Sequence, residues 1–482
     1  MKTAVAVLSK KGENAVPNVL EALDAKGGKE AACVGVATPN EFLTAETFRE
    51  LQAKKLDSPV ALGYAASVAL PRDEPQMMKF ENSAVLFDGI IYSAKEKSAL
   101  EFVAAKLGRD RCKGAASFVL DVEADYFALI VAEPERLVAA RDPVGVQPLY
   151  FGENETLAAF ATNRKTLWNL GIAEPKSFPP GHIATATQAG FKFEPAKTLT
   201  FVEPKPISLD EAAKCLQVLL ENSVQKRVSG LGKVTVAFSG GLDSSVVAFL
   251  AKKCGVEVQL IHVSLENQPE TQEAFDAAEE LQLPLQVHLF KESDVEKTIP
   301  QVVGLIEEGD PVKASIGLPF FWAAQKTAEG GFKALLAGQG ADELFGGYQR
   351  YVKEYLADGD VKVRRTMFED VVNVYESNLE RDEKLCGFHD VELRLPFAAF
   401  GVVEFAMGLP TELKFEGKAD SLRKLVLRKV ALNMGLSPRV AAKPKKAVQY
   451  STGINNALKR IAKKKGLTLA EYVAKLFSEG AS

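Results

Sequence analysis

The sequence lacks the features of a secreted or membrane-bound protein. Its five cysteines are odd in number, scattered and without a Cys-x-x-Cys pair, which predicts reduced thiols instead of a disulfide framework. They are Cys33, Cys112, Cys215, Cys254 and Cys386. No apolar stretch reaches the length of about 18 residues that a membrane-spanning helix needs. We therefore expect a cytoplasmic protein that is neither exported nor inserted into a membrane.

A dominant charge is also missing. Lysine and arginine number 59 and aspartate and glutamate 63, which gives a formal net charge of −4 and a pI near 5.9. Such a chain has no overall field that attracts nucleic acid, although lysine is locally dense at Lys443 to Lys446. Nucleic acid is therefore not expected as a partner.

What the chain does have is enough length, 482 residues, for two domains with cores of their own. Up to about residue 200, short strand-like runs are separated by turns and helical patterns such as Glu41 to Lys54, which predicts an α+β domain (1–200). A segment rich in proline and charge, Phe201 to Ser208, precedes the second domain (209–482). There, strands alternate with helices, which predicts a doubly wound parallel α/β sheet, and from Asp342 onward we expect mostly helix.

The most informative segment is the loop Ser239-Gly240-Gly241-Leu242-Asp243-Ser244-Ser245, between a predicted strand and a predicted helix. At such a junction backbone N–H groups point outward, with the positive end of the helix dipole behind them. The glycines let backbone approach a phosphate, the serines add hydroxyl donors, and Asp243 offers a carboxylate for a divalent cation. The loop predicts a nucleoside triphosphate site, although it fits neither the Gly-x-x-x-x-Gly-Lys-Ser/Thr nor the Gly-x-Gly-x-x-Gly pattern. A strand-to-helix turn without a ligand is the alternative.

A second loop, Gly338 to Tyr348, also follows a predicted strand. Ligands of doubly wound sheets bind beyond the carboxyl ends of the strands, so we expect Asp342 to face Asp243 across the ligand. Two carboxylates from separate strand ends would suit one Mg²⁺ that also binds pyrophosphate. Alternatively, Asp342 and Glu343 cap the start of a helix.

Together the two loops resemble the signatures of the asparagine synthetase family, which belongs to the N-type ATP pyrophosphatases. The resemblance covers 209 to about 455 and continues in order through Asn378 to Asp382, Glu392 to Phe397, Ser421 to Lys424 and Lys443 to Lys446. It implies a PP-loop domain of the adenine nucleotide alpha hydrolase-like fold, with ATP and Mg²⁺ as cofactors. Glu392 and Arg394 are expected to form an ion pair with a partly structural role.

The resemblance also implies roles for individual residues. Asp243 and Asp342 would bind Mg²⁺, and Lys445 would stabilise charge on the α-phosphate as pyrophosphate leaves. Lys446 is the alternative, because the register of the lysine run is ambiguous, and a solvated basic turn also stays open for this run. The β- and γ-phosphates would be held by Ser239, Gly240, Gly241, Asp243 and Ser244, and the adenosine would be lined by backbone near Ala237, Val263 and Gly338.

The chain departs from the pattern of the family at Gln339 and at Ala398-Ala399, where the family often has Leu-Asp after its Pro-Phe motif. Where the family usually has a glutamate that helps to deprotonate or place the incoming amine, this chain has Gln339. We count Gln339 among the candidate catalytic residues and expect a changed amine-donor step.

The first domain resembles the class II glutamine amidotransferase domain in Phe87 to Tyr92, Arg141 to Tyr150 and Pro179 to His182, which implies an Ntn-hydrolase-like fold. Those enzymes use an N-terminal cysteine as the nucleophile, and here Lys2 stands in its place. Asp88 replaces an asparagine whose amide would donate to the oxyanion, and a carboxylate would repel that charge. We expect no glutaminase activity. The domain would instead form a dimer, act as a lid, or contact a separate ammonia donor.

The main hypothesis is therefore an AMP-forming ligase. It would convert a carboxylate, with the β-carboxylate of aspartate as the first candidate, into an acyl adenylate and amidate it with ammonia. Two alternatives stay open: a tRNA-modifying PP-loop enzyme, and an inactive scaffold that regulates a partner.

Overall fold

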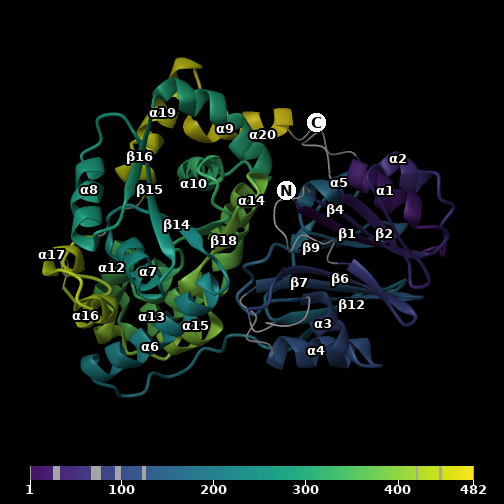
Figure 1. Cartoon of the computed structure of the whole chain (residues 1–482), viewed down its shortest axis with the longest axis horizontal. Coiled ribbons are helices and arrows are strands. Elements are labelled where there is room, and N and C mark those ends of the chain that lie inside the picture. The colour runs from purple at the N-terminus through teal and green to yellow at the C-terminus, as the bar shows by residue number, and fades with distance from the viewer. Residues whose placement is uncertain are drawn as a thin grey trace. The chain divides into compact units, whose positions relative to one another are not determined.

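The computed structural model describes residues 2–24, 33–66, 77–92, 99–121, 126–418, 422–444 and 448–480. Contacts between Cα atoms divide the chain into two compact units, Met1–Thr198 and Leu199–Ser482. Figure 1 shows the elements of both units, and each unit is described by itself below. In the described ranges, no helix is both long and apolar enough to cross a bilayer.

The first unit is a sandwich of two antiparallel sheets. One sheet has the order β11 (Lys176–Ser177), β9 (Tyr150–Glu153), β10 (Leu157–Ala161), β1 (Lys2–Ser9), β4 (Val60–Ala66), β2 (Cys33–Ala37) and β3 (Phe42–Ala45). The other has the order β13 (Gly190–Pro195), β12 (His182–Thr187), β8 (Arg136–Arg141), β7 (Tyr126–Glu133), β6 (Ser83–Ile90) and β5 (Met77–Phe80).

Helices cover the outer faces of both sheets. In β1, the even-numbered residues from Ala4 to Leu8 pack against the other sheet, while Val5 and Val7 pack with the layer of α1 (Val16–Asp24). The second sheet is covered by α3 (Ala99–Leu107) and α4 (Arg111–Asp121). These layers confirm the α+β class, while the finer Ntn-hydrolase-like assignment stays a prediction. The remaining helices of this unit are α2 (Phe48–Gln52) and α5 (Arg164–Asn169).

The helix predicted over Glu41 to Lys54 is wrong in its first half. Residues 42–45 form β3, where Ala45 lies opposite Val34 of β2. The helix α2 begins only after Thr47, whose hydroxyl oxygen accepts a hydrogen bond from the Glu50 N–H. Strand pairing therefore overrides the helical pattern up to that cap.

The second unit is built around a parallel sheet of five strands. Their order is β16 (Leu285–Phe290), β15 (Glu257–Leu265), β14 (Lys233–Ala237), β17 (Ala334–Leu336) and β18 (Glu392–Arg394). The helices up to β17 are α6 (Leu209–Val228), α7 (Leu242–Lys253), α8 (Glu270–Leu281), α9 (Glu292–Ile306) and α10 (Pro311–Glu329). The predicted parallel sheet with alternating helices is confirmed.

The order of the strands reverses beside β14. The chain leaves β14 towards β15 on one side, while β17 pairs with β14 on the other. The carboxyl ends of two such strands open a crevice where ligands of α/β sheets bind. Both glycine-containing loops follow these two strands, which is where the sequence led us to expect a site.

Beyond Asp342 the unit is mostly helical, as predicted, with one strand that was not predicted. Leu393 of β18 is fully buried opposite Leu335 of β17. Glu392 and Arg394 form the expected ion pair. The helical elements are α11 (Ala341–Leu344), α12 (Gln349–Asp358), α13 (Asp360–Val372), the π-helical turn η1 (Tyr375–Leu379), α14 (Glu380–Phe388), η2 (Pro396–Ala398), α15 (Phe400–Met407), η3 (Thr411–Leu413), α16 (Leu425–Asn433), α17 (Pro438–Ala441), α18 (Val448–Ser451), α19 (Ile454–Lys464) and α20 (Leu469–Gly480).

Candidate active site

The first loop leaves β14 and ends in α7. Gly241 is the N-cap of α7, and no side chain in the described part of the protein caps this helix. The N–H groups of its first turn therefore lack an intrahelical partner. The Ser244 hydroxyl oxygen lies 3.4 Å from the backbone nitrogen of Ser239 and donates to the Gly241 carbonyl oxygen at 3.2 Å. These bonds hold a loop whose helix-end donors suit a phosphate group.

Gly240 is required by the backbone of this loop. Its φ is +66°, in the left-handed region that favours glycine. A Cβ atom at Gly240 would lie 2.8 Å from the Cα atom of Ala274 and 2.9 Å from the carbonyl oxygen of Glu273, both in α8. The helix α8 therefore packs directly against the loop.

We expect Gly240→Ala to weaken ATP binding about tenfold or more, because both the left-handed backbone and the contact with α8 force the loop to move. Calorimetric titration with ATP measures the effect. Gly232→Ala is the matched control, since a Cβ atom there meets nothing within 4 Å. Equal ATP affinity in the two variants would contradict a binding role for the loop.

The second loop comes within contact distance of the first. A Cβ atom at Gly338 would lie 2.9 Å from the Cβ atom of Asp243. Gly340 has a φ of +87° and starts the short helix α11, which carries Asp342. The residues predicted to line the adenosine, Ala237, Val263 and Gly338, lie in or just after the neighbouring strands β14, β15 and β17.

Asp243 and Asp342 converge on one buried lysine. The ammonium group of Lys424 lies 2.7 and 2.6 Å from the two carboxylate oxygens of Asp243 and 2.8 Å from Oδ1 of Asp342. The side chain of Lys424 is only 2% exposed. Carboxylate oxygens from two neighbouring strand ends are ligands of the kind that Mg²⁺ takes. The described residues contain no group of three or more metal-ligating side chains, so Mg²⁺ would complete its shell with phosphate oxygens or water.

Replacing Lys424 by methionine removes the cation between the two carboxylates. We expect Lys424→Met to lower the free energy of unfolding of the metal-free protein by about 3 kcal/mol, and Mg²⁺ to restore part of that loss. Urea unfolding with and without Mg²⁺ measures both effects. The control Lys429→Met removes the partner of Asp210, which is 69% exposed, and should cost less than about 1 kcal/mol. A loss of unfolding free energy no larger than that of the control would contradict the conclusion that Lys424 stabilises the two carboxylates.

A pocket lies over the phosphate loop. It is lined by Ser239, Gly241, Leu242, Asp243, Glu270, Glu273, Lys424, Arg428, Lys443, Pro444 and Ser451. The Lys443 ammonium group donates to the Gly240 carbonyl oxygen at 3.0 Å and forms an ion pair with Glu273 at 2.9 Å. Arg428 donates to the Lys443 carbonyl oxygen at 3.0 Å and so fixes this segment. The predicted catalytic residues Lys445 and Lys446 lie outside the described residues.

Comparison with known proteins identifies the family of the chain. A family model described as asparagine synthase matches residues 216–361 and 353–480. A putative glutamine-hydrolysing asparagine synthetase 1 of Methanocaldococcus jannaschii is 34% identical over 394 residues, which cover 72% of this chain and 72% of that protein. This chain belongs to the asparagine synthetase family. Asparagine synthetase 1 of Arabidopsis thaliana is 26% identical over 383 residues, which cover 74% of this chain and 64% of that protein.

The asparagine synthetase family consists of ATP-dependent ligases that form carbon–nitrogen bonds. Among solved structures, a glutamine phosphoribosylpyrophosphate amidotransferase from B. subtilis is 12% identical to this chain. The match covers 60% of this chain and 81% of that chain, with a TM-score of 0.35, which is too low to bear on the fold.

Gln339, which lies in the second loop and is partly buried, joins a polar network with the buried Arg381 and Asp382. Its amide nitrogen donates to Oδ2 of Asp382 at 2.5 Å, and Arg381 donates to both oxygens of the same carboxylate at 2.7 and 3.0 Å. Burial raises the pKa of Asp382, and the Arg381 charge opposes that rise. The network gives the Gln339 amide a fixed orientation. Asn378 to Asp382 carried the family resemblance, but no role for these residues followed from the sequence.

A second carboxyl group extends this network. Glu343 accepts hydrogen bonds from the Tyr348 hydroxyl at 2.7 Å and the Asn378 amide at 3.0 Å. Burial and the nearby charge of Asp342 raise the pKa of Glu343. Glu343 is therefore a buried carboxyl group with a structural role, and it does not cap α11, whose N-cap is Gly340.

In the first unit, side chains of the segments that resemble the amidotransferase domain form hydrogen bonds that stabilise the backbone. Arg141 is fully buried and donates to the carbonyl oxygens of Gln147, Phe178 and Gly145, each at 2.7 Å. The Gln147 amide donates to the Asp88 carboxylate at 2.7 Å. The residues that resemble the amidotransferase domain thus stabilise the fold of this unit.

Cys33 lies near Lys2 in the structure, although the two residues are far apart in the sequence. Lys2 on β1 and Cys33 on β2 both lie opposite Ala66 of β4, so the two residues are separated by a single strand. Burial raises the pKa of the Cys33 thiol, which disfavours the reactive thiolate. The direction of this pKa shift is the opposite of the one that activates a cysteine nucleophile.

Proposed function

We propose that this protein is an AMP-forming asparagine synthetase that uses ammonia. The β-carboxylate of aspartate attacks the α-phosphorus of ATP, which gives β-aspartyl-AMP and pyrophosphate. Ammonia then attacks the acyl carbon and displaces AMP. The observation that carries the proposal is the meeting of Asp243 and Asp342 at Lys424, beside a loop that suits phosphate.

Each part of the site has a task in this reaction. The loop from Ser239 to Ser244 binds the β- and γ-phosphates through backbone N–H groups and hydroxyls. Asp243 and Asp342 would hold Mg²⁺, and the ion would supply positive charge to balance the departing pyrophosphate. Lys424 orients the two carboxylates and balances part of their charge. Lys445 or Lys446 stabilises charge on the α-phosphate.

The network around Gln339 gives this residue a task in placing ammonia. An amide is not a base at neutral pH, so Gln339 cannot remove a proton from the amine. Because the Gln339 nitrogen donates to Asp382, its carbonyl oxygen is the atom that accepts a hydrogen bond from ammonia. Gln339 thus places the nucleophile, which must arrive as NH₃ and not as ammonium.

A product assay tests the proposal. The purified protein is incubated with MgATP, ammonia and one acceptor at a time, and AMP, pyrophosphate and the amide product are measured. We expect AMP and asparagine in equal amounts only when aspartate is present. AMP formed only with tRNA would point to a base-modifying enzyme, and no product with any acceptor would point to an inactive scaffold. Either result would overturn the proposal.

A further inference from the structure

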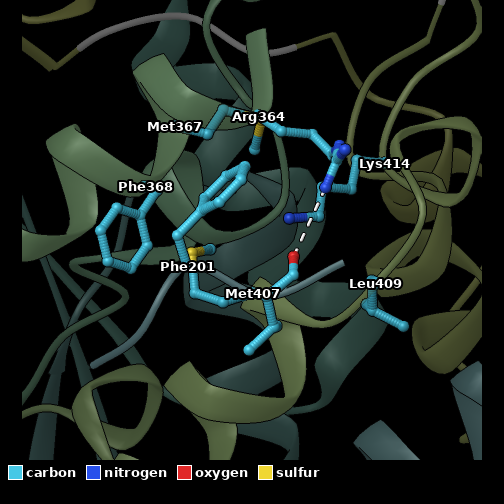
Figure 2. Close-up of a pocket in the computed structure, with 8 residues that line it drawn as sticks. Phe201, Arg364, Met367, Phe368, Met407, Leu409 and Lys414 are labelled. Atoms are coloured by element: carbon cyan, nitrogen blue, oxygen red, sulfur yellow. Dashed lines mark hydrogen bonds between the residues drawn. The ribbon is translucent and has the colours of Figure 1, made fainter. Parts of the chain in front are cut away.

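Outside the nucleotide pocket, charged side chains also meet around a second pocket of the second unit, which Arg364 and Lys414 help to line (Figure 2). This pocket has room for about one water molecule, and two carboxylates already pair with Arg364. It therefore offers no site for a larger ligand. A more extended set of buried charges is the polar network that begins at Gln339, which continues through Asn378 to Glu343.

Asn378 joins two buried charged groups of this network. Its Oδ1 atom accepts a hydrogen bond from Nη1 of Arg381 at 3.2 Å, and its amide nitrogen donates to Oε1 of Glu343 at 3.0 Å. Both of these neighbours are buried. An amide group can offer an acceptor to a guanidinium group and a donor to a carboxylate at the same time. The two neighbours therefore require an amide at this position and fix its orientation.

A π-helical turn presents Asn378 to both neighbours. Asn378 lies in η1, directly before α14, which carries Arg381 and Asp382. Nη1 of Arg381 also donates to the Ser377 carbonyl oxygen at 3.3 Å, so the guanidinium group holds the turn in place. Turns of this kind are rare and occur frequently at functional sites. The turn and the network therefore stabilise each other.

The network connects the two ends of the second loop. One series of hydrogen bonds runs through the side chains of Gln339, Asp382, Arg381, Asn378 and Glu343. Gln339 comes just before α11, and Glu343 lies within α11 beside Asp342. A helix of four residues is not stable by itself, so its side-chain contacts decide where it lies. The network therefore sets the position of Gln339 relative to Asp342.

We propose that Asn378 is a positioning residue that holds the amine site at Gln339 in register with the nucleotide site at Asp342. The inference rests on the proposed function, in which Gln339 places ammonia and Asp342 binds the metal. Asn378 acts through its two hydrogen-bonded neighbours. Without its amide, the acyl adenylate still forms, but ammonia is misplaced, and water displaces AMP from the acyl carbon before ammonia does.

The ratio of AMP to asparagine tests the proposal. Asn378→Leu keeps the size of the side chain and removes both hydrogen bonds, so we expect the KM for ammonia to rise about tenfold and AMP to exceed asparagine. The native protein should form the two products in equal amounts. A purely structural role would lower the amount of active protein and leave the KM and the ratio unchanged. The control is Asn373→Leu, whose exposed asparagine donates to the Glu369 carbonyl oxygen, and it should behave as the native protein does.

A double-mutant cycle shows whether Asn378 acts through Gln339. Gln339→Ala removes the amide that the network holds, so adding Asn378→Leu to it should raise the KM for ammonia no further. Additive effects of the two substitutions would overturn the proposal. So would a native KM and ratio in an Asn378→Leu variant that thermal unfolding shows to be folded.

A second variant carries the same test if Asn378→Leu does not fold. Asn378→Ser leaves room for water beside the two buried charges and removes the amide, so its KM for ammonia and its product ratio should also rise. Native values in Asn378→Ser would overturn the proposal. Native protein that forms no AMP with aspartate would instead overturn the proposed function, and this inference with it.

Discussion

Asp243→Asn and Asp342→Asn should each lower the rate of aspartate-dependent AMP formation by about 10³-fold. Both carboxylates meet at one point beside the phosphate loop, and the amide of asparagine is a weaker ligand of Mg²⁺. The rate of AMP formation at saturating ATP, ammonia and aspartate measures the loss. Asp210→Asn removes a carboxylate that is 69% exposed and should leave the rate unchanged.

The same variants also leave Lys424 with one carboxylate instead of two. Their urea unfolding has to be measured beside the rate, because a partly unfolded protein would lose activity for another reason. A loss of rate in a folded variant supports the catalytic role. A folded Asp342→Asn variant with the native rate would contradict it.

Replacing ammonia by glutamine should lower asparagine formation by about 10⁴-fold or more. By its resemblance to the amidotransferase domain, the first unit would have Lys2 at the place of the nucleophile and Asp88 where a hydrogen-bond donor to the oxyanion is needed. Asparagine formation in saturating glutamine, with ammonia removed, measures this. Robust use of glutamine by the native protein would refute this account of the first unit.

Two variants separate the effect of the missing nucleophile on glutamine use from the effect of the altered oxyanion site. Lys2→Cys alone should not restore use of glutamine, because the Asp88 carboxylate would repel the developing negative charge. Adding Asp88→Asn places an amide in that position and should give the larger response. Full glutamine use by Lys2→Cys alone would show that Asp88 is harmless.

The parts of the site that follow strands were predictable from the sequence. The loop that begins at Ser239 is predicted by local sequence alone, because a strand, a run of small residues and an amphipathic helix follow one another in the chain. The order of strands beside β14 then brings the loop after β17 to the same crevice. For this reason the sequence alone predicts that Asp243 and Asp342 face each other, although it does not predict their contact with Lys424.

The parts that depend on distant side chains were not predictable. Lys424 is 181 residues from Asp243, and Asp382 is 43 residues from Gln339. In the sequence, Lys424 ends a segment that resembles the family, but its position between two carboxylates is visible only in the structure. The strand β18 was missed for a similar reason, because three residues are too few to show a pattern and the pairing with β17 decides their conformation.

Transfer of oxygen from aspartate to AMP tests the central claim most directly. Aspartate labelled with ¹⁸O in its β-carboxylate is converted in the presence of MgATP and ammonia, and the products are analysed by mass spectrometry. If the β-carboxylate attacks the α-phosphorus, one labelled oxygen leaves with AMP and the pyrophosphate stays unlabelled. Label in inorganic phosphate together with ADP would contradict the account, because it would show attack at the γ-phosphorus and a ligase of a different kind.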